Sequence, residues 1–94
     1  MTRRVRLIVS GRVQGVGFRA ATARAAADRA IAGWVANRSD GSVEIEAQGE
    51  PQQLAQFITW CHRGPRWARV ESVAIEELPS GVATEGFTIR QGYR

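Results

Sequence analysis

Residues 5–30 read VRLIVSGRVQGVGFRAATARAAADRA, a segment that changes from strand-like to helix-like across a glycine-rich loop. Val5, Leu7 and Val9 lie on one side of an extended chain, which predicts a strand with one buried face. Three glycines then occur between residues 11 and 17. Seven of the twelve residues 19–30 are alanine, the best helix former, so a helix is predicted there. The segment therefore predicts a strand, a loop and a helix.

A hairpin and a second helix are predicted next. Residues 33–37 and 42–47 predict two paired strands, because the turn-forming sequence RSDG separates them. Pro51 favours the start of a helix, and Gly64-Pro65 favours its end. Within that helix the apolar residues recur at the spacing of a buried stripe. They are Leu54, Phe57, Ile58 and Cys61.

Two strands complete the pattern, one over residues 70–78 and a short one at 87–89 that pairs with a sheet edge. The order strand, helix, strand, strand, helix, strand is typical of the split βαβ arrangement. It predicts an α+β fold in which two helices cover one face of an antiparallel sheet. With 94 residues and 44% hydrophobic content, we expect residues 1–94 to form a single domain.

Composition narrows the class of protein. No apolar run approaches the roughly 20 residues of a membrane span, and no secretory signal is apparent, so we expect a soluble cytoplasmic protein without membrane contact. The single cysteine, Cys61, excludes an internal disulfide. One cysteine with one histidine is too little for a zinc site, so we expect neither a metal nor another cofactor.

The positive charge is concentrated near the N-terminus. The net charge is +4, and every basic residue is arginine. Up to Arg29 there are seven arginines against one acidic residue, Asp28. Arginine grips phosphate or carboxylate with a planar fork of two hydrogen bonds, so this region favours an anionic ligand.

The loop at residues 15–19, GVGFR, lies where a helix start leaves backbone N–H groups without partners. Glycines there allow successive N–H groups to point at one anion. The loop lacks the ending of a Walker motif and the spacing of a dinucleotide fingerprint. On chemistry alone, a phosphate cradle and an ordinary strand-to-helix turn both stay open.

Two longer motifs point to a specific family. Residues 9–19, VSGRVQGVGFR, followed by residues 33–37, GWVAN, and residues 40–43, DGSV, together resemble the acylphosphatase family. Weaker similarity continues to residue 90, so it covers essentially the whole chain. The chain departs from the family pattern at several positions. They are Ala20 and Ala21 after the arginine, Arg29-Ala30-Ile31 at the helix end, and Ala36 before the asparagine.

The resemblance implies a ferredoxin-like βαββαβ fold and hydrolysis of acyl phosphates, which are carboxyl–phosphate anhydrides. It implies that Arg19 binds the phosphate and that Asn37 orients the attacking water. The phosphate-binding loop would consist of Gln14, Gly15, Val16, Gly17 and Phe18. Inorganic phosphate or sulfate would be a ligand of the same site, and we expect a monomer.

Other side chains favour structural roles. Cys61 fits the buried stripe, and His62 fits the end of the second helix. Glu44 and Glu46 share a strand face, which the solvated side of a sheet explains.

Two other functions remain as alternatives. A nucleic-acid binder would suit the fold and the charge, but the predicted central strands lack the aromatic residues that RNA-recognition modules place there. A regulatory module, or a part of a larger carbamoyl-transfer protein, is the third possibility. Both proposed catalytic residues, Arg19 and Asn37, favour the enzyme.

Overall fold

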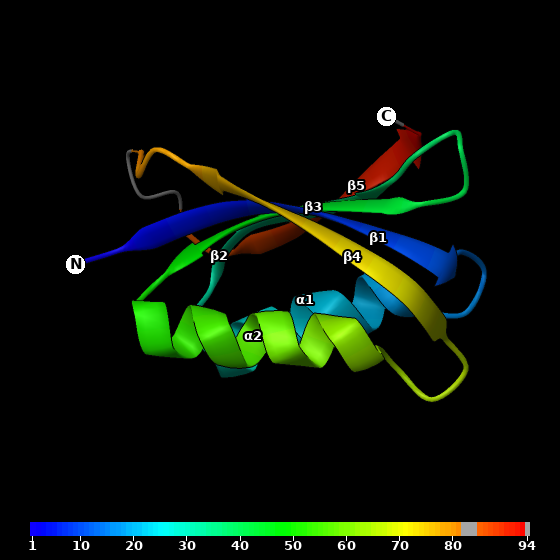
Figure 1. Cartoon of the computed structure of the whole chain (residues 1–94), viewed down its shortest axis with the longest axis horizontal. Helices are drawn as coiled ribbons and strands as arrows, with labels where there is room; N and C mark the ends of the chain where they lie inside the picture. Colours follow the sequence, from blue (N-terminus) through cyan, green and yellow to red (C-terminus); the bar gives the residue numbers. More distant parts are fainter. Residues whose placement is uncertain (82–84, 94) are drawn as a thin grey trace.

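The computed structural model describes residues 1–81 and 85–93, which form two helices and five strands. Both helices lie on the same side of the sheet, as the sequence predicts (Figure 1). The strands are β1 (Arg3–Arg12), β2 (Ala32–Asn37), β3 (Val43–Gly49), β4 (Arg69–Leu78) and β5 (Phe87–Tyr93), and the helices are α1 (Phe18–Asp28) and α2 (Pro51–Arg63).

The sheet has the strand order β4-β1-β3-β2-β5. β1 pairs antiparallel with β3 and β4, and β2 pairs antiparallel with β3, which confirms the predicted antiparallel core of the fold. β5 was expected as a short strand on an edge. It extends to Tyr93 and pairs in parallel with β2, so the complete sheet is mixed.

The hydrophobic core lies between the sheet and the helices. The predicted inward side chains of β1 are buried there, and the stripe of α2 meets them. Ile58 is half-buried beside that stripe, and Trp60 packs with its ring centroid 5.9 Å from that of Phe18. Cys61 is buried in the core as predicted, and burial raises the pKa of its thiol to about 12. Because the thiol stays protonated at neutral pH, Cys61 is a core residue without nucleophilic character.

The C-terminal end of α1 places an alanine where a glycine is favoured. Ile31 N–H donates to Ala26 O at 2.9 Å and Ala30 N–H donates to Ala27 O at 3.3 Å, the bond pattern of a Schellman motif. Ala30 has φ of 54°, the left-handed conformation that this motif requires. A Cβ atom makes that conformation costly, so the chain retains strain at Ala30.

We expect Ala30→Gly to stabilise the protein by about 1 kcal/mol, which raises Tm by roughly 4–8 °C in a domain of this size. Ala23→Gly is the matched control, because Ala23 lies in the middle of the same helix and takes no part in the motif. Glycine in a helix interior lowers stability by roughly 0.5–1 kcal/mol. Thermal unfolding of both variants tests the assignment, and equal destabilisation by the two substitutions would contradict it.

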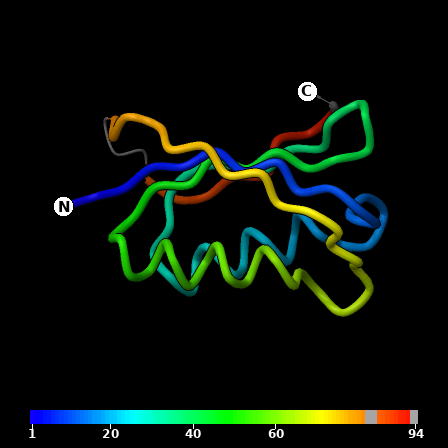
Figure 2. The backbone as a smooth tube through the Cα atoms, viewed as in Figure 1, coloured from blue at the N-terminus to red at the C-terminus, as the bar shows by residue number. Residues whose placement is uncertain are grey.

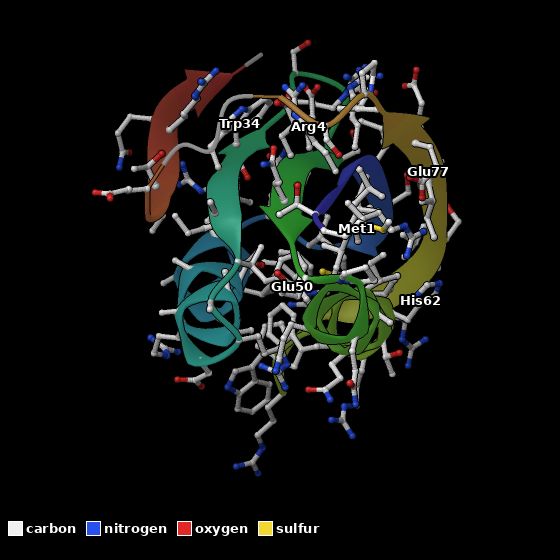
Figure 3. All side chains as sticks on the ribbon, turned by 90° about the vertical axis from the view of Figure 1, so that its left-hand side faces the viewer. Met1, Arg4, Trp34, Glu50, His62 and Glu77 are labelled. Atoms are coloured by element: carbon white, nitrogen blue, oxygen red, sulfur yellow. The ribbon has the colours of Figure 1, made fainter. Side chains whose placement is uncertain are left out.

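The face of the sheet away from the helices carries charged and aromatic side chains. Figure 3 shows Arg4 and Trp34 on this face. Arg4 pairs with Glu46, and Arg6 Nε donates to Glu44 Oε2 at 2.7 Å. Glu44 lies on this outer face as expected, but it is only 5% exposed, so the expectation that it is solvated is wrong. Its burial is tolerated because arginines on neighbouring segments pair with the carboxylate.

Candidate active site

One hollow of about 250 Å³ collects most of the residues that the sequence singles out. It lies where the β1–α1 loop, the first turn of α1, the end of β2 and β5 meet. Figure 2 shows this loop and the β2–β3 turn at the same end of the molecule. The hollow is lined by Val13, Gly15, Gly17, Phe18, Arg19, Ala20, Asn37, Ile89 and Gln91.

The loop owes its shape to two glycines. Gly15 has φ of 75° and Gly17 has φ of 77°, a region that side chains with a Cβ adopt only at a cost. Gly17 is the N-cap of α1 and supplies no side-chain cap, and the first turn of the helix carries no acidic residue. The positive end of the helix dipole therefore lies at the hollow with its N–H groups uncapped by side chains, which favours an anion.

Arg19 is half-buried in the first turn of α1. Its Nη1 donates to the carbonyl oxygen of Arg90 on β5 at 3.2 Å. Within the described part of the chain, no carboxylate forms an ion pair with Arg19. Since a guanidinium has five N–H donors, most of them are available to a ligand in the hollow.

Asn37 is the last residue of β2, and it lies between Val43 of β3 and Tyr93 of β5 in the sheet register. The register between β2 and β5 shifts just before Asn37. Its Oδ1 is buried, and no donor from residues 1–81 or 85–93 reaches it. A buried acceptor without a partner costs free energy, so this amide is suited to bind a polar group that enters the hollow.

The remaining loop residues play different parts. Phe18 is 2% exposed, with its ring in the core, and it contributes to the wall of the hollow from there. Val16 packs against the core. The Gln14 side chain is bonded to the β2–β3 turn, where its Nε2 donates to Arg38 O at 2.8 Å. Neither Gln14 nor Val16 lines the hollow.

Sequence reasoning missed the contribution of β5. Ile89 and Gln91 line the hollow, and Arg90 lends its carbonyl oxygen to Arg19. The sequence predicted only a short strand at 87–89. It contains no local signal for parallel pairing with β2, which lies far earlier in the chain. Ala20 was noted as a departure from the family, and it lies in the wall of the hollow.

The described residues 1–81 and 85–93 hold no group of three His, Cys, Asp or Glu side chains that could bind a metal ion. His62 is exposed near the end of α2, with Nδ1 3.0 Å from Ile58 O. No helix in the described part of the chain is long and apolar enough to cross a membrane.

Solved structures with the same fold identify the class of protein. An acylphosphatase from Bacillus subtilis superposes with a TM-score of 0.91 at 40% identity, over 97% of this chain and all of that one. Full-length HypF, a structure with bound phosphate and nucleotide, matches with a TM-score of 0.88 at 25% identity, but over only 12% of its own length. The fold and the hollow thus define a ferredoxin-like α+β hydrolase domain.

Sequence comparisons give the family. Residues 5–89 match the sequence model of the acylphosphatase family. The chain is 47% identical over 89 residues to an acylphosphatase of Rubrobacter xylanophilus. This alignment covers 95% of this chain and 81% of that protein. It is 52% identical over 82 residues to an acylphosphatase of Marinobacter nauticus, with 87% and 86% covered. The chain belongs to the acylphosphatase family, and its reaction is the hydrolysis of acyl phosphates.

Proposed function

We propose that Arg19 and the backbone N–H groups of the loop from Gln14 to Phe18 hold the phosphoryl group, and that Asn37 positions the water that attacks it. One observation carries the proposal. The hollow brings Arg19, without a carboxylate partner, to the same space as Asn37, whose buried Oδ1 has no donor among the described residues. In the sequence these two residues lie on different elements, eighteen positions apart.

The chemistry asks little else of the protein. The oxygen of water attacks phosphorus, and the bond between phosphorus and the acyl oxygen breaks. The electron pair of that bond leaves on the carboxylate, which is already a stable anion, so no strong general acid is required. The proton of the water passes to a phosphoryl oxygen or to solvent. What the site supplies is positioning and positive charge around the phosphoryl oxygens.

The proposed site separates the two tasks. Arg19 and the start of α1 supply donors to the phosphoryl oxygens. The Asn37 amide can accept a hydrogen bond from the water and donate another, so it can fix the water in line with the leaving carboxylate. Hydrolysis of benzoyl phosphate, with inorganic phosphate as a competitive inhibitor, tests the whole site. If a saturating concentration of phosphate did not inhibit turnover, the proposed phosphate-binding site would be contradicted.

We expect hydrolysis to continue in excess EDTA, because the proposed site uses only Arg19, Asn37 and backbone N–H groups. Benzoyl phosphate hydrolysis is measured before and after chelation and after addition of magnesium. Loss of turnover on chelation, followed by recovery with magnesium, would overturn the metal-independent mechanism.

The proposal extends to a monomer in the cytoplasm, folded as one domain over residues 1–94 and without affinity for nucleic acid or membranes. The outer face of the sheet supports the nucleic-acid part. RNA-recognition modules stack bases on aromatic side chains of the central strands. Here β1 and β3 present Arg6 and Glu44 in an ion pair at the corresponding face. Gel filtration and titration with single-stranded RNA test these statements.

A further inference from the structure

The side chain of Gln14 joins the phosphate loop to the β2–β3 turn. Its single amide nitrogen, Nε2, donates to Arg38 O at 2.8 Å and to Ser42 O at 2.9 Å. An amide nitrogen has two hydrogens, so both donors of Gln14 are used on this turn. Gln14 therefore reaches across to a segment more than twenty residues away, and its amide nitrogen has no hydrogen left for a phosphate.

The turn that receives these bonds is closely braced. Arg38 N–H donates to Ser42 O at 2.8 Å, which closes the turn. Ser42 donates from its N–H and its hydroxyl to Asp40 Oδ1, at 2.9 and 2.6 Å. The hydroxyl bond is the main reason that the pKa of Asp40 is lowered, so its carboxylate is charged at neutral pH. The turn is thus a stiff element rather than a loose connection.

The side chain of Arg38 is also held in place, by two carboxylates. Its Nη1 lies 3.5 Å from Glu44 Oε1, and Glu44 is buried on β3. Its Nε lies 3.6 Å from Asp40 Oδ2. Asn37 is the residue directly before Arg38, so whatever holds the Arg38 carbonyl also constrains the position of Asn37. Gln14 directly precedes Gly15, the first glycine of the loop.

We propose that Gln14 is a positioning residue, whose side chain sets the distance between the phosphate loop and Asn37. This role rests on the proposed function, because it matters only if the two parts act on one substrate. It replaces the expectation that the Gln14 side chain binds the phosphate itself. A displacement of about 1 Å between reacting groups can cost on the order of 10²-fold in rate, so a clamp of two hydrogen bonds has a large effect on turnover.

The first test is Gln14→Met, which keeps the length of the side chain and removes both donors. We expect kcat for benzoyl phosphate to fall by roughly 10–100-fold, in line with misplacement of a catalytic group. The inhibition constant of phosphate stays within about threefold of the original, because Arg19 and the loop N–H groups are untouched. Loss of phosphate inhibition in proportion to kcat would make Gln14 a phosphate ligand and overturn the proposal.

Gln48→Met is the matched control. Gln48 also donates its Nε2 to a backbone carbonyl, Gly81 O, at 3.4 Å, and it does not line the hollow. The same chemical change there should leave kcat unaltered. If the two variants lost turnover equally, the effect of Gln14 would be general destabilisation rather than positioning.

Gln14→Glu gives a signature in pH. At neutral pH its carboxylate faces two carbonyl oxygens and cannot donate, so kcat is low. Protonation restores one O–H donor, and the carbonyl oxygens favour the protonated form. We expect kcat relative to the original protein to rise as pH falls, and the rise to begin above about 4–5, the usual range of a glutamate, because the carbonyl oxygens raise its pKa. The Gln14→Met variant shows no such rise. A flat ratio for both variants contradicts the clamp.

A double-mutant cycle separates this proposal from the proposed function. If Gln14 acts through Asn37, Gln14→Met costs little once Asn37→Ala is present, and the two losses are not multiplied. Fully multiplied losses overturn the coupling. Full turnover in Asn37→Ala alone overturns the water-positioning role instead. Wild-type kcat in Gln14→Met, with an impaired Asn37→Ala, overturns the clamp alone.

Discussion

Replacing Arg19 with alanine is expected to lower turnover of benzoyl phosphate by on the order of 10³-fold or more, the usual effect of removing an arginine from phosphoryl-transfer chemistry. Arg19 lines the hollow and pairs with no carboxylate of the described chain, so its charge is not consumed by a structural ion pair. The same contact serves bound phosphate and the transition state. Competitive inhibition by phosphate should therefore disappear together with turnover.

Arg19→Lys and Arg24→Ala complete the experiment. A lysine supplies a point charge but not the planar fork, so Arg19→Lys is expected to rescue little of the activity. Arg24 lies on the same helix and is exposed, and it does not line the hollow. Arg24→Ala should keep kcat and phosphate inhibition near normal. Near-normal activity in Arg19→Lys would mean that Arg19 contributes only its positive charge and not a planar contact with the phosphate.

Asn37→Ala is expected to lower kcat by on the order of 10²–10³-fold, the typical cost of losing one well-placed polar group in an active site. Phosphate inhibition should stay nearly unchanged, because Arg19 and the loop remain. The structural cost should be small, since no donor of the described chain satisfies Oδ1 and its removal leaves no such donor unpaired.

Measuring kcat, the phosphate inhibition constant and Tm on one Asn37→Ala sample separates catalysis from support of the hairpin. Asn37→Asp is the companion variant, because it keeps the shape and replaces the amide donor with a negative charge near the phosphoryl oxygens. It should be at least as slow as Asn37→Ala and should also weaken phosphate binding. Full turnover in Asn37→Ala, with a lowered Tm, would refute the water-positioning role.

Local sequence signals predicted most of the fold. The apolar side chains on one side of residues 5–9 predicted β1, and the alanine content of residues 19–30 predicted α1. The apolar stripe of α2 predicted which face of that helix is buried. Each of these signals depends on residues close together in the chain, which is why they were sufficient. The full length of β5 and its parallel pairing with β2 were not predicted, because they depend on partners distant in the sequence.

The candidate site was predicted in part for the same reason. Arg19 and Asn37 were found through sequence motifs, and the structure places both at one hollow. The hydrogen bonds of Gln14 could not be predicted from the sequence. Their acceptors are main-chain carbonyl oxygens, which every residue has, so no residue type identifies them. The burial of Glu44 was missed, because it depends on Arg6 and Arg38 from other segments of the chain.

The supports of the site share a property that bears on evolution. Arg19 bonds the carbonyl oxygen of residue 90, and Gln14 bonds those of residues 38 and 42. All twenty amino acids carry that carbonyl, so mutation at positions 38, 42 and 90 can change the side chain without deleting the acceptor. The acceptor is thus retained under drift at each of these positions, although loss of the Arg38 side chain or of the Ser42 hydroxyl would weaken the turn itself. Arg19 and Gln14 have no such substitute.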